Sequence, residues 1–232
     1  MLLGVDGCRS GWLALTAGIE GTEVRDQLHL EARSLLGQPG WQLMAIDIPI
    51  GLPERGSRAC DQEARRLLGA RRSSVFPAPI RAVLAARDQQ QACLISRQQQ
   101  GKGLSVQSFN ILAKIRSIDE LLQADPSLAY RIHEVHPELI FQQWNDGRPM
   151  EHGKKTAQGK QERLQLVETE FPGAWATIRQ RHRRSDVADD DILDALAALH
   201  TARRLQHGHA LQLPSQPPIE IDACGLPMRI SA

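Results

Sequence analysis

Two apolar runs in the first fifty residues each end in an aspartate, and this repeated pattern constrains the fold most. LLGVD (2–6) precedes the polar turn GCRS, and LMAID (43–47) precedes a segment that contains proline. Such runs are typical of strands buried in a sheet. An unpaired carboxylate at the end of a buried strand is costly or takes up a proton. We therefore expect the two aspartates to share a role, although each could simply cap a turn.

The stretch between these runs predicts how they are arranged. WLALTAG and TEVRDQLHL follow the first run after polar turns, so we expect a meander of three antiparallel strands. A short helix near EARSLLG then leads to the second run. This connection is long enough for a crossover, which places the second run parallel to the first strand. Asp6 and Asp47 would then lie side by side at the carboxyl edge of the sheet, where ligand sites of open α/β sheets occur.

The remaining chain predicts mostly helices and one further strand. Apolar spacing and breakers predict helices over 58–68, 82–100, 106–123, 160–171 and 191–205, a strand ending near 136, a charged connection over 179–191 and a small hairpin turned at CGLP near the end. The order fits an α/β protein with a mixed sheet and helices on both faces. At 232 residues, we expect a single domain over 1–232 with a helical and loop insertion at about 52–105.

Composition and cysteine spacing argue against several classes of protein. The chain carries 28 Lys and Arg against 27 Asp and Glu, a net charge of +1, so its overall charge favours neither a nucleic-acid binder nor a membrane binder. The four cysteines are far apart and form no C-x-x-C pair, which argues against a zinc ribbon or a redox motif. No targeting segment or long apolar run stands out. We expect a soluble, cytoplasmic protein with reduced thiols; the sequence does not indicate an oligomeric state.

The segment DDDILDALAAL carries a second group of aspartates. Asp189 and Asp190 stand where aspartate ordinarily caps a helix. Asp194 lies beyond the first turn among apolar residues, where aspartate has poor helix propensity and no free N–H to cap. Asp191 is three residues earlier and therefore on the same helix face, which small alanines continue. Like charges at this spacing repel unless a cation lies between them. Mg²⁺ or Mn²⁺, which prefer oxygen ligands, could be that cation.

Five motifs resemble those of a known family. GVDGCRSGW, AIDIPIGLP, CDQEARRLLGARRSSVFPAPIRAVL, EVHPELIF and DDDILDALAAL occur in this order over nearly the whole chain. They resemble the predicted RNase H-like nuclease family known as domain of unknown function 429. The last motif is also similar to the terminal helix of the Holliday-junction resolvase RuvC, which has Asp-x-x-Asp followed by Ala-Leu-Ala.

The resemblance implies a strand order of 3-2-1-4-5 and a role for each aspartate. Asp6 and Asp47 would be metal ligands at strand ends, and Asp191 and Asp194 would complete a catalytic site for one or two Mg²⁺ or Mn²⁺ ions. One departure concerns Asp47, because such resolvases commonly carry glutamate at the fourth strand. The shorter side chain implies a different ion or a different spacing.

Two residues of HEVHPEL are further candidates for the site. Glu134 and His136 lie at the end of the predicted fifth strand, on one strand face by alternation. Glu134 could be another ligand, and His136 could transfer a proton or orient water. The alternative is that both only cap the helix that starts at Pro137.

Basic and hydroxyl residues near the predicted turns could bind phosphate. Arginine with neighbouring hydroxyls suits phosphate, although a solvated basic turn is a common alternative. The substrate-binding candidates are Arg9, Arg71, Arg72, Ser73, Ser74 and Lys102. GKGLS, which contains Lys102, lacks the full P-loop pattern.

These patterns favour a metal-dependent phosphodiester hydrolase that acts on nucleic acid or a nucleotide, by attack of an activated water. Two alternatives stay open. Actin-like phosphotransferases and ATPases share the fold and also end their first strand in Asp-Gly, although they normally need two such domains. A non-catalytic module that binds nucleic acid or protein is the other, but a pure binder gains nothing from four mutually repelling carboxylates.

Overall fold

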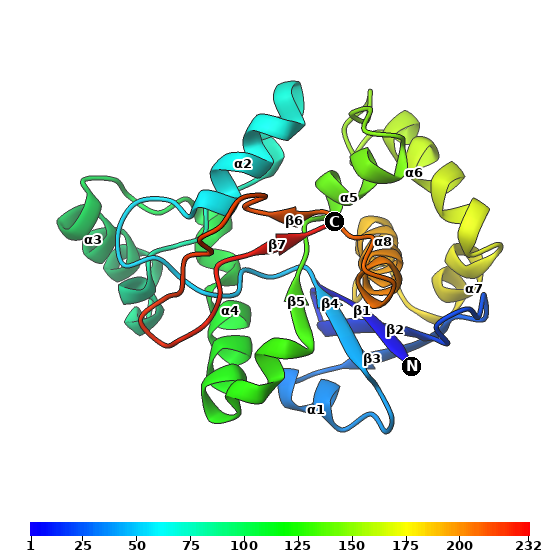
Figure 1. The fold of residues 1–232 in the computed structure, drawn as a ribbon, viewed down its shortest axis with the longest axis horizontal. Coiled ribbons are helices and arrows are strands. Elements are labelled where there is room, and N and C mark those ends of the chain that lie inside the picture. Colours follow the sequence, from blue (N-terminus) through cyan, green and yellow to red (C-terminus); the bar gives the residue numbers. More distant parts are fainter.

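A five-stranded mixed sheet forms the centre of the computed structural model, which describes residues 1–232 (Figure 1). Its strand order is β3-β2-β1-β4-β5; β1, β2 and β3 pair antiparallel, whereas β4 is parallel to both β1 and β5. The strands are β1 (Leu2–Cys8), β2 (Gly11–Ala17), β3 (Arg25–His29), β4 (Leu43–Ile46) and β5 (Ile132–Glu134). The predicted meander, crossover and strand order are confirmed.

Helices cover both faces of the sheet, and a separate apolar cluster lies between each face and its helices. One face carries α2 (Ala59–Leu68), α5 (Pro137–Trp144), α6 (Ala157–Glu170), α7 (Ala174–Arg181) and α8 (Asp189–Gln206). The other carries α1 (Ala32–Leu36), α3 (Gln89–Gln100), α4 (Val106–Ala124) and the short 3-10 helices η2 (Arg81–Ala85) and η3 (Pro126–Tyr130). The predicted α/β class with helices on both faces is confirmed.

The chain outside this framework adds two smaller features. A 3-10 helix, η1 (Gly69–Ser74), follows α2, and the short strands β6 (Gln212–Leu213) and β7 (Ile230–Ser231) pair antiparallel. The segment 52–105, expected to be an insertion, contributes buried residues of α2 to one apolar cluster and of α3 to the other. No helix of the structure combines the length and the apolar character needed to cross a membrane.

Several elements differ from the prediction for local reasons. The polar helix expected over 82–100 is divided, because Asp88 accepts the N–H of Gln91 and so starts α3 anew. Helix α7 lies in the stretch GAWATIRQR, whose weak apolar pattern did not predict it. Near CGLP there is only an isolated bridge between Ile221 and Pro227, and the strand partner of the C-terminal β7 is β6 instead.

Helix α8 crosses β1 at very short range because β1 has a glycine there. A Cβ atom at Gly4 would lie 2.2 Å from the backbone N of Leu199 and 2.4 Å from the carbonyl O of Ala195. The small side chain of Ala195 favours the same close approach. This contact fixes the position along β1 at which the acidic start of α8 lies against the sheet.

Replacing Gly4 by alanine is expected to lower the free energy of unfolding by about 1–3 kcal/mol, because α8 must move away from β1. Urea unfolding monitored by circular dichroism measures the change. Gly18→Ala is the matched control, since its added Cβ would meet no atom closer than 3.6 Å. Equal midpoints for the two variants would contradict the tight packing of α8.

Candidate functional site

Asp6 and Asp47 are neighbours at the carboxyl edge of the sheet. The pair Val5 and Ile46 is the last one in register between β1 and β4, and each aspartate follows directly. The N–H of Asp47 donates to the carbonyl of Val5 at 3.0 Å. Adjacent strands lie about 4.8 Å apart, so the two carboxylates start from neighbouring backbone positions. By alternation, Asp6 shares the face of Gly4, which is the face that α8 covers.

Helix α8 brings two more carboxylates to the same edge. Its residues next to Gly4 are Ala195 and Leu199, so Asp191 and Asp194 lie about one turn nearer the helix start. Asp194 is almost fully buried, as is Asp6. Asp191 is half-buried, and its Oδ2 accepts the N–H of Ala188 at 2.7 Å, so this carboxylate also caps the helix. We call Asp6, Asp47, Asp191 and Asp194 the carboxylate cluster.

Burial and mutual repulsion both disfavour ionisation of the carboxylates in the cluster. Burial raises the pKa of Asp6 well above its usual range, and the charges of Asp194, Asp47 and Asp191 raise it further. Burial, followed by the charge of Asp194, raises the pKa of Asp47 to about 8. The pKa of each of these two aspartates depends on the charges of other carboxylates of the cluster. Elements distant in sequence therefore place these carboxylates within electrostatic range of one another.

One cation touches the carboxylate cluster. The Nζ of Lys154 donates to Oδ2 of Asp194 at 2.7 Å and lies 3.6 Å from Oδ2 of Asp190. The side chain of Lys154 is 41 % exposed, whereas that of Asp194 is 4 % exposed. No other lysine, arginine or histidine side chain comes within 4.0 Å of a carboxylate of the cluster. The sequence suggests that Lys154 could line the cleft but does not identify Asp194 as its partner.

The raised pKa of Asp47 makes stability depend on pH in the absence of metal. A carboxyl group whose pKa is higher in the folded than in the unfolded chain binds its proton more tightly when folded, so stability is lost as pH rises toward the folded value. With EDTA present, we expect the free energy of unfolding to fall between about pH 7 and 8, by up to about 1.4 kcal/mol per pH unit, and to level off above the folded value. The buried histidines, with lowered pKa values, are already neutral in this window.

Urea unfolding of the wild type and of Asp47→Asn across this pH window measures the effect. Asn at this position carries no proton to lose, so its pH profile should be flatter than that of the wild type. Parallel profiles would show that Asp47 titrates at its ordinary pKa.

Glu134 has another partner on the opposite face of the sheet. It pairs in register with Ile46, whereas Asp47 follows that residue on the face of α8. Both of its carboxylate oxygens accept from Arg58 at 2.6 Å, and Oε2 also accepts the N–H of Ile50. Arg58, itself 1 % exposed, binds Asp61 as well. The structure thus does not bring Glu134 into the carboxylate cluster as a ligand, because its charge already neutralises a buried guanidinium.

His136 lies between the carboxylate cluster and η1. Its Nε2 is 3.2 Å from the carbonyl of Ser74, which makes Nε2 the protonated nitrogen, and its buried Nδ1 has no partner. Burial lowers its pKa, and the nearby charge of Asp194 opposes this shift. His136 makes no side-chain bond that caps α5. His136 thus occupies the N-cap position of α5 without capping it through its side chain, and its ring instead contacts the basic turn formed by η1 (Gly69–Ser74).

The comparisons with known proteins agree with the motifs. The family model described as a protein of unknown function, DUF429, matches residues 4–219. The chain belongs to the DUF429 family. No curated protein and no solved structure matches it.

The basic turn of this DUF429 protein borders the site through Arg71. Its Nε donates to the carbonyl of Met150 at 2.9 Å, and its guanidinium lies beside Gly153, next to Lys154. Arg72 and Ser73 of η1 are exposed. Arg9 is exposed in the turn that follows β1. Of these candidates, only Arg71 has contacts that place it near Lys154.

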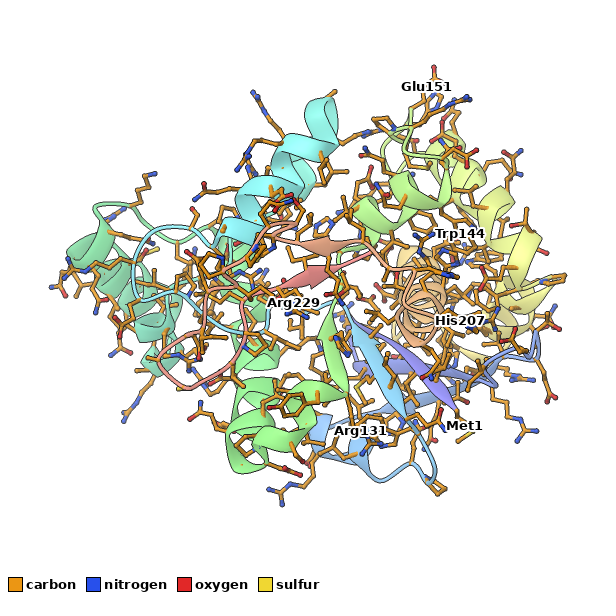
Figure 2. The ribbon with its side chains drawn as sticks, in the orientation of Figure 1. Met1, Arg131, Trp144, Glu151, His207 and Arg229 are labelled. Carbon is orange, nitrogen blue, oxygen red and sulfur yellow. The ribbon has the colours of Figure 1, made fainter.

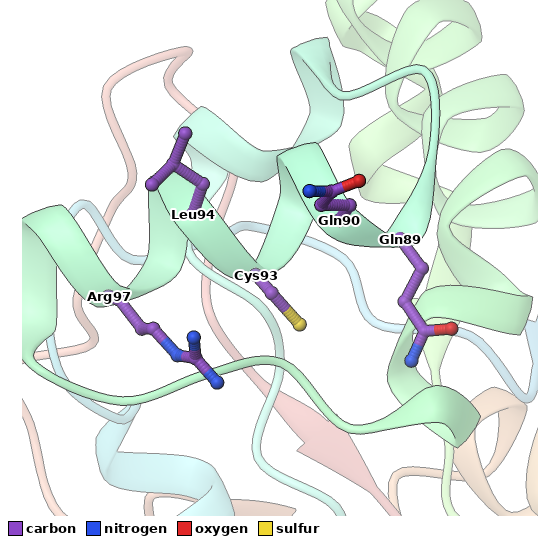
Figure 3. Close-up of a pocket in the computed structure, with 5 residues that line it drawn as sticks. All are labelled: Gln89, Gln90, Cys93, Leu94 and Arg97. Atoms are coloured by element: carbon purple, nitrogen blue, oxygen red, sulfur yellow. The ribbon is translucent and has the colours of Figure 1, made fainter.

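Lys102 lies elsewhere. Its loop follows α3, where Gly103 approaches Cys93 and Arg97. These two residues also line a shallow hollow on α3 that contains no carboxylate (Figure 3). Helices α3 and α8 pack on opposite faces of the sheet, and α3 lies at the left end of the molecule, away from α8 (Figure 1), so the structure does not bring Lys102 to the carboxylate cluster.

A separate group of possible metal ligands, from the loop between α5 and α6 and from α6 itself, was missed by sequence reasoning. The ligand atoms of Glu151, His152 and Glu162 all lie within 4.8 Å of one another. Glu162 accepts from Nδ1 of His152 at 2.7 Å and from its N–H at 3.0 Å, so the two residues satisfy each other. Glu151 is exposed at the outer edge of the molecule (Figure 2). We assign this DUF429 loop no ion.

The carboxylate cluster fits a hard divalent cation in its chemistry. Its donors are carboxylate oxygens, the ligands that Mg²⁺ and Mn²⁺ prefer. The neighbouring negative charges that add to the effect of burial in raising the pKa of Asp6 and Asp47 also attract positive charge.

Proposed function

We propose that this DUF429 protein is a metal-dependent phosphodiester hydrolase that acts on nucleic acid or a nucleotide. The observation that carries the proposal is that Asp6, Asp47, Asp191 and Asp194 come together at one sheet edge, where burial, together with the charges of neighbouring aspartates, raises the pKa of every one of them. A protein gains no stability from burying such a group. A site that holds divalent ions explains it.

The four carboxylates would hold one or two Mg²⁺ or Mn²⁺ ions, which supply an activated water and a stabilised leaving oxygen when bound. Other residues of the chain would bind the substrate. Arg71 and Arg72 of η1 would bind the phosphate of the substrate, since guanidinium groups bind phosphate oxygens in pairs. His136 holds the Ser74 carbonyl and thereby positions the same turn.

The test is a cleavage assay on labelled single-stranded, duplex, RNA–DNA hybrid and junction substrates, with Mg²⁺ or Mn²⁺. Asp194→Asn, purified in parallel, controls for contaminating nucleases. Metal-dependent cleavage that the variant lacks would support the proposal and identify the substrate class.

Absence of cleavage from a folded protein that binds metal would contradict the polynucleotide substrate. It would favour small phosphorylated substrates and the phosphotransferase class that shares this fold.

A further inference from the structure

Lys154 reaches the carboxylate cluster from outside the framework that forms it. The four carboxylates stand on two strands and one helix, whereas Lys154 belongs to the irregular loop between α5 and α6. Its ammonium nevertheless lies 2.7 Å from Oδ2 of Asp194. The side chain is 41 % exposed, so a path to solvent is open to it.

The ammonium neutralises part of the cluster at long range too. Its charge opposes the upward pKa shifts of Asp6, Asp47 and Asp191, although it contacts only Asp194 and Asp190. The neighbouring Lys155 is exposed and forms no ion pair. One lysine of an adjacent pair is thus selected as the counter-ion.

A divalent ion and this ammonium compete for the same oxygen. Asp194 is the carboxylate of the cluster that Lys154 holds, and it is also one of the proposed ligands. Two cations on one buried carboxylate repel each other strongly in surroundings of low dielectric constant. The exposed lysine is the one that can leave.

We propose that Lys154 is an exchangeable counter-ion: it neutralises the carboxylate cluster in the metal-free protein and leaves Asp194 when a divalent ion binds. This inference rests on the proposed metal site and adds a competition that sets its affinity. Because the Lys154–Asp194 pair exists only without metal, Lys154 stabilises the metal-free form and opposes metal binding. The two effects are linked and have to be equal in free energy.

The test compares Lys154→Gln with Lys155→Gln, without using activity. In EDTA, Lys154→Gln should lower the melting temperature, whereas in saturating Mn²⁺ it should melt with the wild type. Calorimetric titration with Mn²⁺ should show about tenfold tighter binding for Lys154→Gln. Lys155→Gln should match the wild type in all three measurements.

An equal loss of melting temperature in EDTA and in Mn²⁺ would overturn the inference, since the pair would then persist in the metal-bound protein. Unchanged Mn²⁺ affinity would overturn it as well. In both cases wild-type Mn²⁺ binding would leave the proposed metal site intact. If Mn²⁺ neither bound nor stabilised the wild type, the proposed site and the inference would fail together.

Discussion

Asp6→Asn is expected to lower the rate of metal-dependent phosphodiester cleavage by about 10³-fold or more, with the fold intact. Asp6 lies at the centre of the carboxylate cluster, because three other carboxylates raise its pKa. Asparagine has nearly the same shape but removes one anionic ligand. Since the substitution also relieves repulsion, the variant should be at least as stable as the wild type in EDTA.

Cleavage kinetics of the best substrate, together with urea unfolding in EDTA, measure both effects. Asp88→Asn is the matched control, because Asp88 is exposed and caps α3, a role that asparagine also fills. Full activity of Asp6→Asn would remove the carboxylate cluster from the mechanism.

Asp194→Asn should also lose cleavage but should differ from Asp6→Asn in stability. Asp194 is the partner of Lys154, so its replacement removes an ion pair as well as a repulsion. The two variants thereby separate the catalytic role of the cluster from its internal neutralisation.

Glu134→Gln is expected to lower the free energy of unfolding by about 1–3 kcal/mol, because the amide replaces one of the two carboxylate oxygens that accept from the buried Arg58, whose charge Asp61 still compensates. Both Glu134 and Arg58 are almost inaccessible to water, and their two bonds of 2.6 Å join β5 to the segment that starts α2. The amide of glutamine would also direct N–H groups toward the guanidinium.

Urea unfolding with Glu151→Gln as the exposed control measures this loss. Mn²⁺ affinity, titrated in the same samples, should stay near that of the wild type, because Glu134 lies on the face opposite the carboxylate cluster. A large drop in Mn²⁺ affinity without a loss of stability would instead make Glu134 a metal ligand.

Much of the fold could be predicted from local signals. The apolar runs ending in Asp6 and Asp47, the turns between the first strands and the length of the crossover led to the strand order that the structure has. Helix α8 could be predicted because its aspartates at the start and its alanines have clear periodicity. Helix α7 could not, since its residues show no strong apolar face.

The position of Glu134 shows where alternation along a strand fails as a guide. Glu134 and His136 are two residues apart, which suggests one face, but β5 ends at Glu134 and the chain turns into α5. Glu134 therefore meets Arg58, whereas His136 meets the turn at Ser74. No pattern near Glu134 identified Arg58, 76 residues away, as its partner.

The sequence by itself determined which carboxylates follow the buried apolar runs and which share one helix face, because periodicity and propensity are local properties of the chain. Tertiary structure alone decided which charges meet. It placed Lys154 against Asp194 and Arg58 against Glu134, since a buried charge takes whatever counter-charge the packing of distant segments brings within reach.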